Sequence, residues 1–385
     1  MALSEIKGQE RAVSHLKKSL AAGRLAHAYL FYGPEGIGKE LTAKNFAKLL
    51  NCRSPSDGDA CDFCEECVAA EKHIHPDVIW LRPRGRGRVI PIGDPDNPDQ
   101  GTVRHFQRTV SLKPYMGRWK VGIFTDAHTL QKEGASALLK TLEEPPAHTL
   151  LILVTSRPDM LLPTIISRCR AVRFEAMREE ALEEILRSEY SLARAEAGAL
   201  SRLTEGRLGE AVRALREERL GATRELTQRL ADGGRGYWST VAKLLSVIDS
   251  SVMRTEEAVE WELAEKGIRA RRGEEESPAG EEEGEDVEEQ IEAFAAGEMR
   301  RRQEELLKEL LVWYRDLMVW KLTASGELLV GAGGADRVAR TAGGMSLNRI
   351  QESIRRIETA VRSMRGNTDF RTVVENLLVQ LMTGQ

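Results

Sequence analysis

The chain has 385 residues, of which 41% are hydrophobic and 30% are charged, so it can bury a sizeable core and is not globally disordered. Its net charge of −4 at pH 7 excludes a protein that holds nucleic acid by bulk positive charge alone. A chain of this length favours about two or three domains.

The N-terminal segment and the cysteines predict a cytoplasmic protein with no membrane partner. Charged residues such as Glu5, Lys7 and Glu10 interrupt any apolar signal core. The longest strongly apolar run, Leu150 to Val154, is too short to span a bilayer. Four of the five cysteines fall in one cluster, which argues against a disulfide scaffold and favours a reducing compartment.

Residues 1–176 alternate short apolar runs with helical stretches, which is typical of a parallel α/β sheet. Helices are expected over Glu40–Leu50 and Ala135–Leu142. The expected strands are Ala28–Tyr32, Val78–Leu81, Lys120–Thr125, Leu150–Thr155 and Val172–Phe174. We therefore predict an α/β domain over the first 176 residues.

The rest of the chain is expected to be helical. Residues 177–216 form a small helical unit, which we name the lid, and residues 217–385 form a larger helical domain. Apolar residues recur there at steps of three and four, the spacing of a buried helix face. Residues 273–290 contain ten acidic residues and no basic one, so we expect a solvated, disordered insertion. Without that segment the chain would carry a net charge of +6.

A glycine-rich loop between the first expected strand and helix fits the phosphate-binding pattern G-x-x-x-x-G-K over Gly33 to Lys39. Gly33, Gly36 and Gly38 would let backbone N–H groups point at a phosphate, and Lys39 would reach the terminal phosphates. The pattern normally ends in Ser or Thr, whose hydroxyl holds Mg²⁺, but here Glu40 follows. The loop therefore predicts a phosphate-binding fold, with ATP or ADP binding left as an even choice against a loop that keeps only its shape.

A second ATPase element is expected at the end of the strand that begins at Lys120. An apolar strand there should end in Asp-Glu, with the Asp supporting Mg²⁺ and the Glu positioning water. This chain instead has Thr125 and Asp126. Both motifs therefore lack the residue that would hold or support Mg²⁺. We predict poor ATP hydrolysis by the chain alone.

Cys52, Cys61, Cys64 and Cys67 follow the spacing C-x8-C-x2-C-x2-C. Four thiolates at such spacing supply a closed tetrahedral site for a structural Zn²⁺, with no open position for water. We therefore predict a zinc-binding insertion over about residues 52–67 and treat the nearby His73 and His75 as ordinary loop residues.

Several strings together resemble the clamp-loader branch of the AAA+ ATPases. They are His75-Pro76-Asp77, K-V-G-I-F-T-D-A-H from Lys120, A-L-L-K-T-L-E-E-P-P from Ala137 and L-P-T-I-I-S-R-C-R from Leu162. The resemblance is dense from residue 6 to about 174 and weaker in the C-terminal third.

The resemblance implies a subunit of a hetero-oligomeric ring that uses ATP to load a sliding clamp onto primer–template DNA during replication by DNA polymerase III. The partners would be tau/gamma and delta subunits and the clamp, and the C-terminal helices would form a collar. Arg168 would act as an arginine finger in trans on a neighbour's ATP, and Thr155 falls at the polar sensor position. Gly209 stands where the family's ATPase motors carry a nucleotide-sensing Arg.

Other classes stay open from the residues alone. A tau/gamma-type ATPase motor would need the Mg²⁺ ligands that Glu40 and Thr125 replace. A zinc-containing nucleic-acid binder could use the four arginines between Arg82 and Arg88, although such a run is more often a solvated loop.

Overall fold

A computed structural model describes residues 2–84, 89–216, 303–326, 329–331, 335–364 and 369–383. The described residues fall into two compact units that divide between Ala176 and Met177. The acidic segment 273–290 lies outside the described residues. In the ranges given above, no helix is both long enough and apolar enough to cross a membrane.

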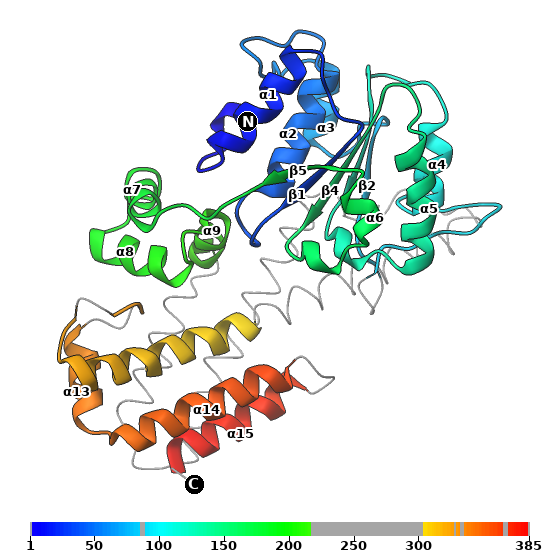
Figure 1. Cartoon of the computed structure of the whole chain (residues 1–385). Helices are drawn as coiled ribbons and strands as arrows, with labels where there is room; N and C mark the ends of the chain where they lie inside the picture. Colours follow the sequence, from blue (N-terminus) through cyan, green and yellow to red (C-terminus); the bar gives the residue numbers. More distant parts are fainter. Residues whose placement is uncertain are drawn as a thin grey trace, which may run out of the picture. The chain divides into compact units, whose positions relative to one another are not determined.

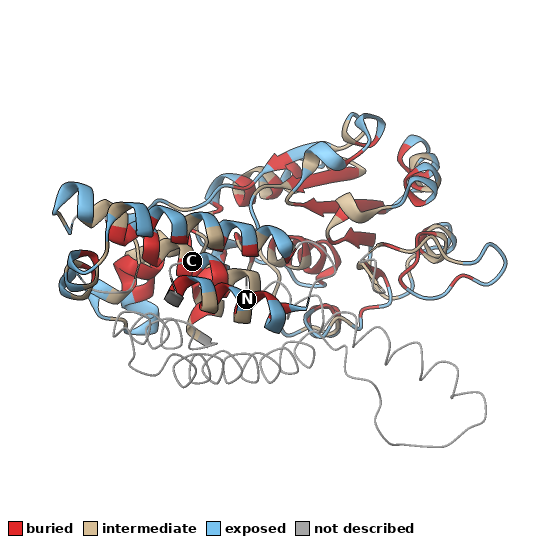
Figure 2. Ribbon diagram, turned by 90° about the horizontal axis from the view of Figure 1, so that it is seen from below, coloured by how far each residue is buried: buried red, intermediate tan, exposed pale blue. Residues whose placement is uncertain are grey.

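The N-terminal unit contains a five-stranded, fully parallel sheet in the order β2-β3-β4-β1-β5. The strands are β1 (Ala28–Tyr32), β2 (Val78–Leu81), β3 (Lys120–Phe124), β4 (Thr149–Thr155) and β5 (Arg170–Arg173). Every residue of β3 and β4 is buried, as Figure 2 shows for the strands in red. Strands covered on both faces must be apolar throughout, which is why these runs do not alternate with polar residues.

Helices cover both faces of this sheet (Figure 1). On one side α1 (Glu10–Ala21) and α2 (Lys39–Asn51) share a core with β1 and β4. On the other side α4 (Val103–Val110), α5 (Lys132–Glu143) and α6 (Pro163–Ile166) share a second core with the same two strands, and Phe106, Leu138 and Ile165 are among its members. A short helix, α3 (Glu65–Glu71), packs against α2.

The predicted α/β fold class is confirmed, with modest differences at the boundaries. The last strand is Arg170–Arg173 rather than Val172–Phe174, and α5 begins at Lys132 rather than Ala135. The α4 helix was not predicted. Its N-cap is Thr102, whose hydroxyl accepts the backbone N–H of His105 and so caps the first turn.

Among its described residues, the second unit has helices and no strand. Three helices, α7 (Glu179–Tyr190), α8 (Arg194–Leu203) and α9 (Leu208–Arg216), surround a small core of Leu and Ala side chains. A separate core joins the helix over residues 303–323 to α13 (Ala335–Gly343), α14 (Leu347–Ser363) and α15 (Phe370–Thr383). The predicted stripe on residues 347–364 is largely buried there, including Ile350 and Ile357.

Candidate functional site

The phosphate loop joins β1 to α2, and its glycines carry the turn. Gly33, Gly36 and Gly38 have φ values of +148°, +73° and +91°, which side chains disfavour. A Cβ on Gly33 would lie 2.3 Å from the carbonyl oxygen of Phe174, so no larger residue fits. Gly38 is the residue before the first turn of α2, so the loop leads directly into a helix N-terminus. The backbone therefore has the form that a bound phosphate requires.

The lysine of this loop bonds to the loop itself. Lys39 Nζ donates to the carbonyl oxygen of Gly33 at 2.7 Å and to that of Pro34. Burial lowers the pKa of Lys39 to about 8, and the carboxylates of Glu35, Asp126 and Glu40 only partly oppose this shift.

Glu40, at the position where the motif carries Ser or Thr, is held by Arg82, the residue that follows β2. Its Oε1 lies 2.8 Å from a guanidinium nitrogen of Arg82. The Arg82 guanidinium also sits 4.5 Å from the centre of the Trp80 ring, and that ring contacts His73 in a tilted arrangement with the centroids 4.6 Å apart. Arg82 is therefore not part of a solvated loop, and its side chain is only 19% exposed.

Two threonines stand at the carboxyl ends of neighbouring strands. Thr125, after β3, has its Oγ1 3.4 Å from the carbonyl oxygen of Leu81. Thr155, at the end of β4, is buried, and its Oγ1 lies 3.0 Å from Nδ1 of His128. The Thr155 hydroxyl also accepts the backbone N–H of Arg157 at 3.0 Å. Both threonine hydroxyls thus have protein partners.

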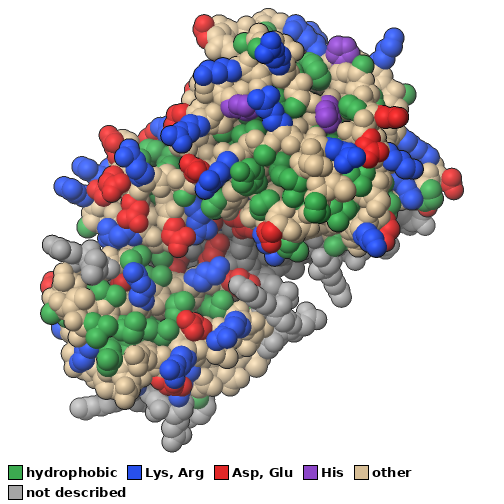
Figure 3. Space-filling view, viewed as in Figure 1, with side chains coloured by type: hydrophobic (Ala, Val, Ile, Leu, Met, Phe, Trp, Pro, Cys, Tyr) green, Lys and Arg blue, Asp and Glu red, His purple; other side chains and the backbone are tan. Residues whose placement is uncertain are grey.

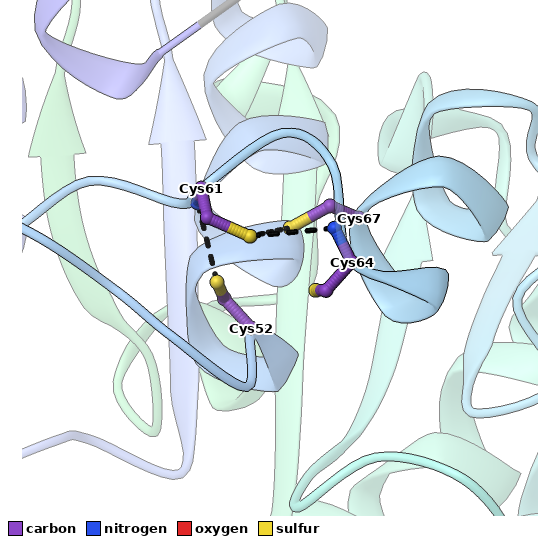
Figure 4. Close-up of side chains that lie close together, drawn as sticks. All are labelled: Cys52, Cys61, Cys64 and Cys67. Atoms are coloured by element: carbon purple, nitrogen blue, oxygen red, sulfur yellow. Dashed lines mark hydrogen bonds between the residues drawn. The ribbon is translucent and has the colours of Figure 1, made fainter.

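The four cysteines converge on one point from the end of α2, the following loop and the start of α3 (Figure 4). All four Sγ atoms lie within 4.8 Å of one another, and Cys61 Sγ is 3.9 Å from Cys67 Sγ. Tetrahedral Zn–S bonds of ~2.3 Å would separate the sulfurs by ~3.8 Å, so the cluster fits a zinc ion. Backbone N–H groups donate to sulfur within the loop, from Cys61 to Cys52 at 3.2 Å and from Cys64 to Cys61 at 3.4 Å.

Neither neighbouring histidine joins this cluster. Among the described residues, the four cysteines are the only group of His, Cys, Asp or Glu side chains placed to share a metal ion. His75 Nδ1 instead accepts the backbone N–H of Asp77 at 3.0 Å, and the His73 ring contacts that of Trp80.

The cysteine module is tied to the phosphate-loop helix by a buried lysine. Lys48 in α2, with a side chain only 1% exposed, lies 2.5 Å from Asp62 Oδ1 in the cysteine loop and 3.0 Å from Glu71 Oε2 in α3. Burial alone would lower the pKa of Lys48, but its bonds to both carboxylates raise it above the ordinary value. The lysine therefore stays charged and joins the module to α2.

Arg168 lies between α6 and β5, an edge strand of the sheet. One guanidinium nitrogen donates to Glu143 Oε1 at 2.7 Å and another to the Thr164 carbonyl oxygen at 3.1 Å. About a third of the side chain, 35%, is exposed. Its partner Glu143 is the last residue of α5 and is 53% exposed, so the pair sits at the surface.

Comparisons with known proteins match this domain to one family. Residues 8–178 match the family model described as "DNA polymerase III, delta subunit". The α/β domain is therefore similar to this DNA polymerase III family.

Relatives found by sequence identity also carry the names of DNA polymerase III subunits. The chain is 33% identical over 254 residues to DNA polymerase III subunit tau of Salmonella typhimurium, covering 64% of this chain and 36% of that protein. It is 36% identical over 183 residues to subunit tau/gamma of Haemophilus influenzae, covering 48% and 25%. The chain thus spans about a third or less of the length of these relatives.

A gamma subunit-related protein of Thermotoga maritima aligns with 96% of this chain and 98% of its own, at 15% identity and a TM-score of 0.44.

Within this α/β domain, the sequence pattern identifies the glycines and cysteines but not the side chains that hold them. Arg82 was assigned to a basic loop, and Lys48 and Asp77 received no role. Asp77 is fully buried and accepts the N–H groups of Tyr115, Met116 and Gly117 at 2.7–2.8 Å. The available signal was a charged residue inside or beside a strongly apolar run, because such a residue needs a partner.

Proposed function

We propose that this chain is a delta-prime-type subunit of the DNA polymerase III clamp loader. In this role it stands in a hetero-oligomeric ring with tau/gamma and delta subunits and helps to place the sliding clamp on primer–template DNA. It supplies an arginine to a neighbour's ATP and hydrolyses little ATP itself. The family match of residues 8–178 supports the assignment to a clamp loader.

One contrast carries the finer assignment. The loop that would hold this chain's own ATP has Glu40 paired to Arg82 and a neutral Thr125, whereas Arg168 reaches the surface at the end of α6. A guanidinium delivered across a subunit boundary can neutralise charge that develops on the γ-phosphate during transfer. A weak nucleotide site of its own combined with a surface arginine fits a subunit that assists ATP hydrolysis in a neighbouring subunit.

The remaining parts follow from this role. Zinc on the four cysteines would be structural, because four sulfurs leave no open position for a substrate or water. Residues 177–216 would act as the lid and residues 217–385 as the collar that joins the ring. Thr155 would be the polar sensor of a weak or vestigial nucleotide site.

A tau/gamma-type ATPase motor is the second candidate, because the relatives at 33% and 36% identity carry those names. The two candidates differ in what the isolated chain does with ATP. Steady-state turnover by the purified chain at rates typical of a motor would favour tau/gamma and contradict the delta-prime assignment.

Direct DNA contact by the run from Arg82 to Arg88 receives less support. Arg82 is engaged by Glu40, and Arg84 donates to the carbonyl oxygen of Gln100 at 2.6 Å. Residues 85–88 lie outside the described part of the chain. On the face drawn in Figure 3, Lys and Arg side chains are scattered among acidic and apolar ones rather than gathered in one stripe.

The test of the proposed function is the variant Arg168→Ala in a reconstituted clamp loader. ATP hydrolysis stimulated by clamp and DNA should fall by ~10³-fold, because arginine fingers are worth that much or more in rate. Arg168→Lys should rescue poorly, because an ammonium lacks the planar fork of a guanidinium.

Arg173→Ala is the matched control, since Arg173 lies nearby in β5 and forms an exposed pair with Glu175. Both variants should fold and assemble, because exposed ion pairs contribute at most ~1 kcal/mol to stability. Wild-type hydrolysis and clamp loading by the Arg168→Ala complex would refute the role in trans.

A further inference from the structure

The sheet register brings Arg82 beside the position where a P-loop ATPase carries its metal-supporting Asp. Leu81 of β2 pairs with Phe124 of β3, so the next residues, Arg82 and Thr125, leave the sheet side by side. Thr125 is further fixed by its backbone N–H, which donates to the Leu81 carbonyl oxygen at 3.0 Å. From this place Arg82 reaches Glu40 in the first turn of α2.

Arg82 is held on two sides, which makes its placement specific. The Glu40 carboxylate takes one side of the guanidinium at 2.8 Å, and the Trp80 ring lies 4.5 Å away. The tilted contact between the Trp80 and His73 rings in turn helps to fix the indole. A guanidinium stacks on an aromatic face while it pairs with a carboxylate, which an ammonium does less well.

The residues present do not fit Mg²⁺. This ion needs near-octahedral oxygen ligands at about 2.0–2.1 Å and is usually held by one or two carboxylates together with phosphates and water. Here the loop hydroxyl is replaced by Glu40, whose charge Arg82 already balances. The supporting Asp is replaced by Thr125, whose hydroxyl faces the carbonyl oxygen of Leu81. A metal ion at Glu40 would have to compete with the Arg82 guanidinium for that carboxylate.

We propose that the Arg82–Glu40 pair stands in place of Mg²⁺ at this phosphate loop and makes the loop indifferent to that ion. Arg82 supplies part of the positive charge that such a loop otherwise obtains from the metal. The loop therefore does not accept a magnesium–nucleotide complex as such, and any polyphosphate that it holds is held as the metal-free anion. This inference rests on the phosphate-loop geometry and is independent of the role of Arg168.

The test measures binding of a fluorescent ATP analogue to the isolated full chain, once with magnesium chloride and once with EDTA. For the wild type the two titrations should agree within about threefold, or both should show no binding. The double variant E40T/R82Q restores the hydroxyl and removes the guanidinium. It should bind at least ~10-fold more tightly with magnesium than with EDTA, a difference of ~1.4 kcal/mol or more.

R84Q is the matched control, because Arg84 belongs to the same basic run but bonds to a backbone carbonyl of residue 100 instead of Glu40. It should respond to magnesium as the wild type does. Zinc content and circular dichroism confirm that each variant is folded. The proposal is overturned if the wild type binds ~10-fold more tightly with magnesium, or if folded E40T/R82Q stays indifferent to it.

This outcome can be separated from that of the proposed function. The Arg168→Ala experiment follows ATP bound by a neighbouring subunit in the assembled ring, whereas the titration follows ATP analogue on this chain alone. Either result can therefore fail while the other stands.

Discussion

The phosphate loop and the cysteine module lie at opposite ends of the same helix, and they keep different parts of their motifs. At the N-terminus of α2 the backbone retains the glycine conformations of a phosphate loop, but the side chains at the metal positions have changed. At its C-terminus all four cysteines are present and their sulfurs converge. The shape of a loop that is set by backbone dihedrals can persist after its metal-binding side chains have changed. A metal site made of side chains keeps its shape only while each coordinating side chain remains.

The largest effect should come from breaking the cysteine module. We expect about one zinc ion per chain, and Cys64→Ser should release it because only thiolates complete this site. Loss of a structural metal should destabilise the α/β unit by at least ~4 kcal/mol. Elemental analysis and urea unfolding measure both quantities.

Cys169→Ser is the control for this change, because Cys169 lies outside the cluster and should not affect zinc content. The core around α13, α14 and α15 should be unaffected by Cys64→Ser, since it is built from other residues. Metal-free protein with unchanged stability of residues 52–67 would remove the zinc assignment.

The pH dependence of stability probes the other end of α2. The pKa of Lys39 is about 8 in the folded chain against 10.5 unfolded, so between these values the unfolded chain binds the additional proton. Stability rises with pH wherever the unfolded state binds more protons. From pH 8 to 10.5 the free energy of unfolding of the wild type should therefore rise by up to ~3 kcal/mol relative to that of Lys39→Met, since one pKa unit is worth ~1.4 kcal/mol.

The difference between the two proteins is the quantity to measure, by urea unfolding at several pH values, because other titrating groups cancel in it. A difference that stays flat across this window would show that Lys39 does not fold back on the loop as described. A difference that falls with pH would contradict the direction of the shift.

The smallest of the three effects tests the connection between the two regions. Lys48→Met keeps the length of the side chain but removes the charge that joins α2 to Asp62 and Glu71. The two carboxylates are 39% and 45% exposed and can rehydrate, so we expect a loss of ~1.5 kcal/mol, the low end for hydrogen bonds to charged groups. Zinc affinity, measured by competition with a chelator, should fall in parallel.

Lys44→Met serves as the control, because Lys44 contacts Glu71 at 2.6 Å and leaves the cysteine loop untouched. It should cost less in stability and should not alter zinc affinity. Equal losses of stability and zinc affinity for the two lysine variants would show that Lys48 is no more important than Lys44 in joining α2 to the cysteine module.

Features carried by local pattern were predictable from the sequence. Buried parallel strands such as Leu150–Thr155 are continuous apolar runs, and the cysteine spacing is itself a ligand geometry. The pairs Arg82–Glu40 and Lys48–Asp62 were not predictable, because their members come together only through the tertiary fold. The strand at Arg170–Arg173 was misplaced because three of its four residues are exposed, so only Val172 gives an apolar signal.

In the loop before β3, the carboxylate of Asp77 holds the backbone in place although a side chain of that loop is exposed. Tyr115 is 86% exposed, yet its backbone N–H and those of the next two residues donate to that one buried carboxylate. Burial alone would raise the pKa of Asp77, but these amide bonds and Lys120 hold it below its ordinary value. The aromatic ring thus stands in solvent on a backbone whose conformational entropy was already lost on folding, and a partner that contacts it would have little left to immobilise.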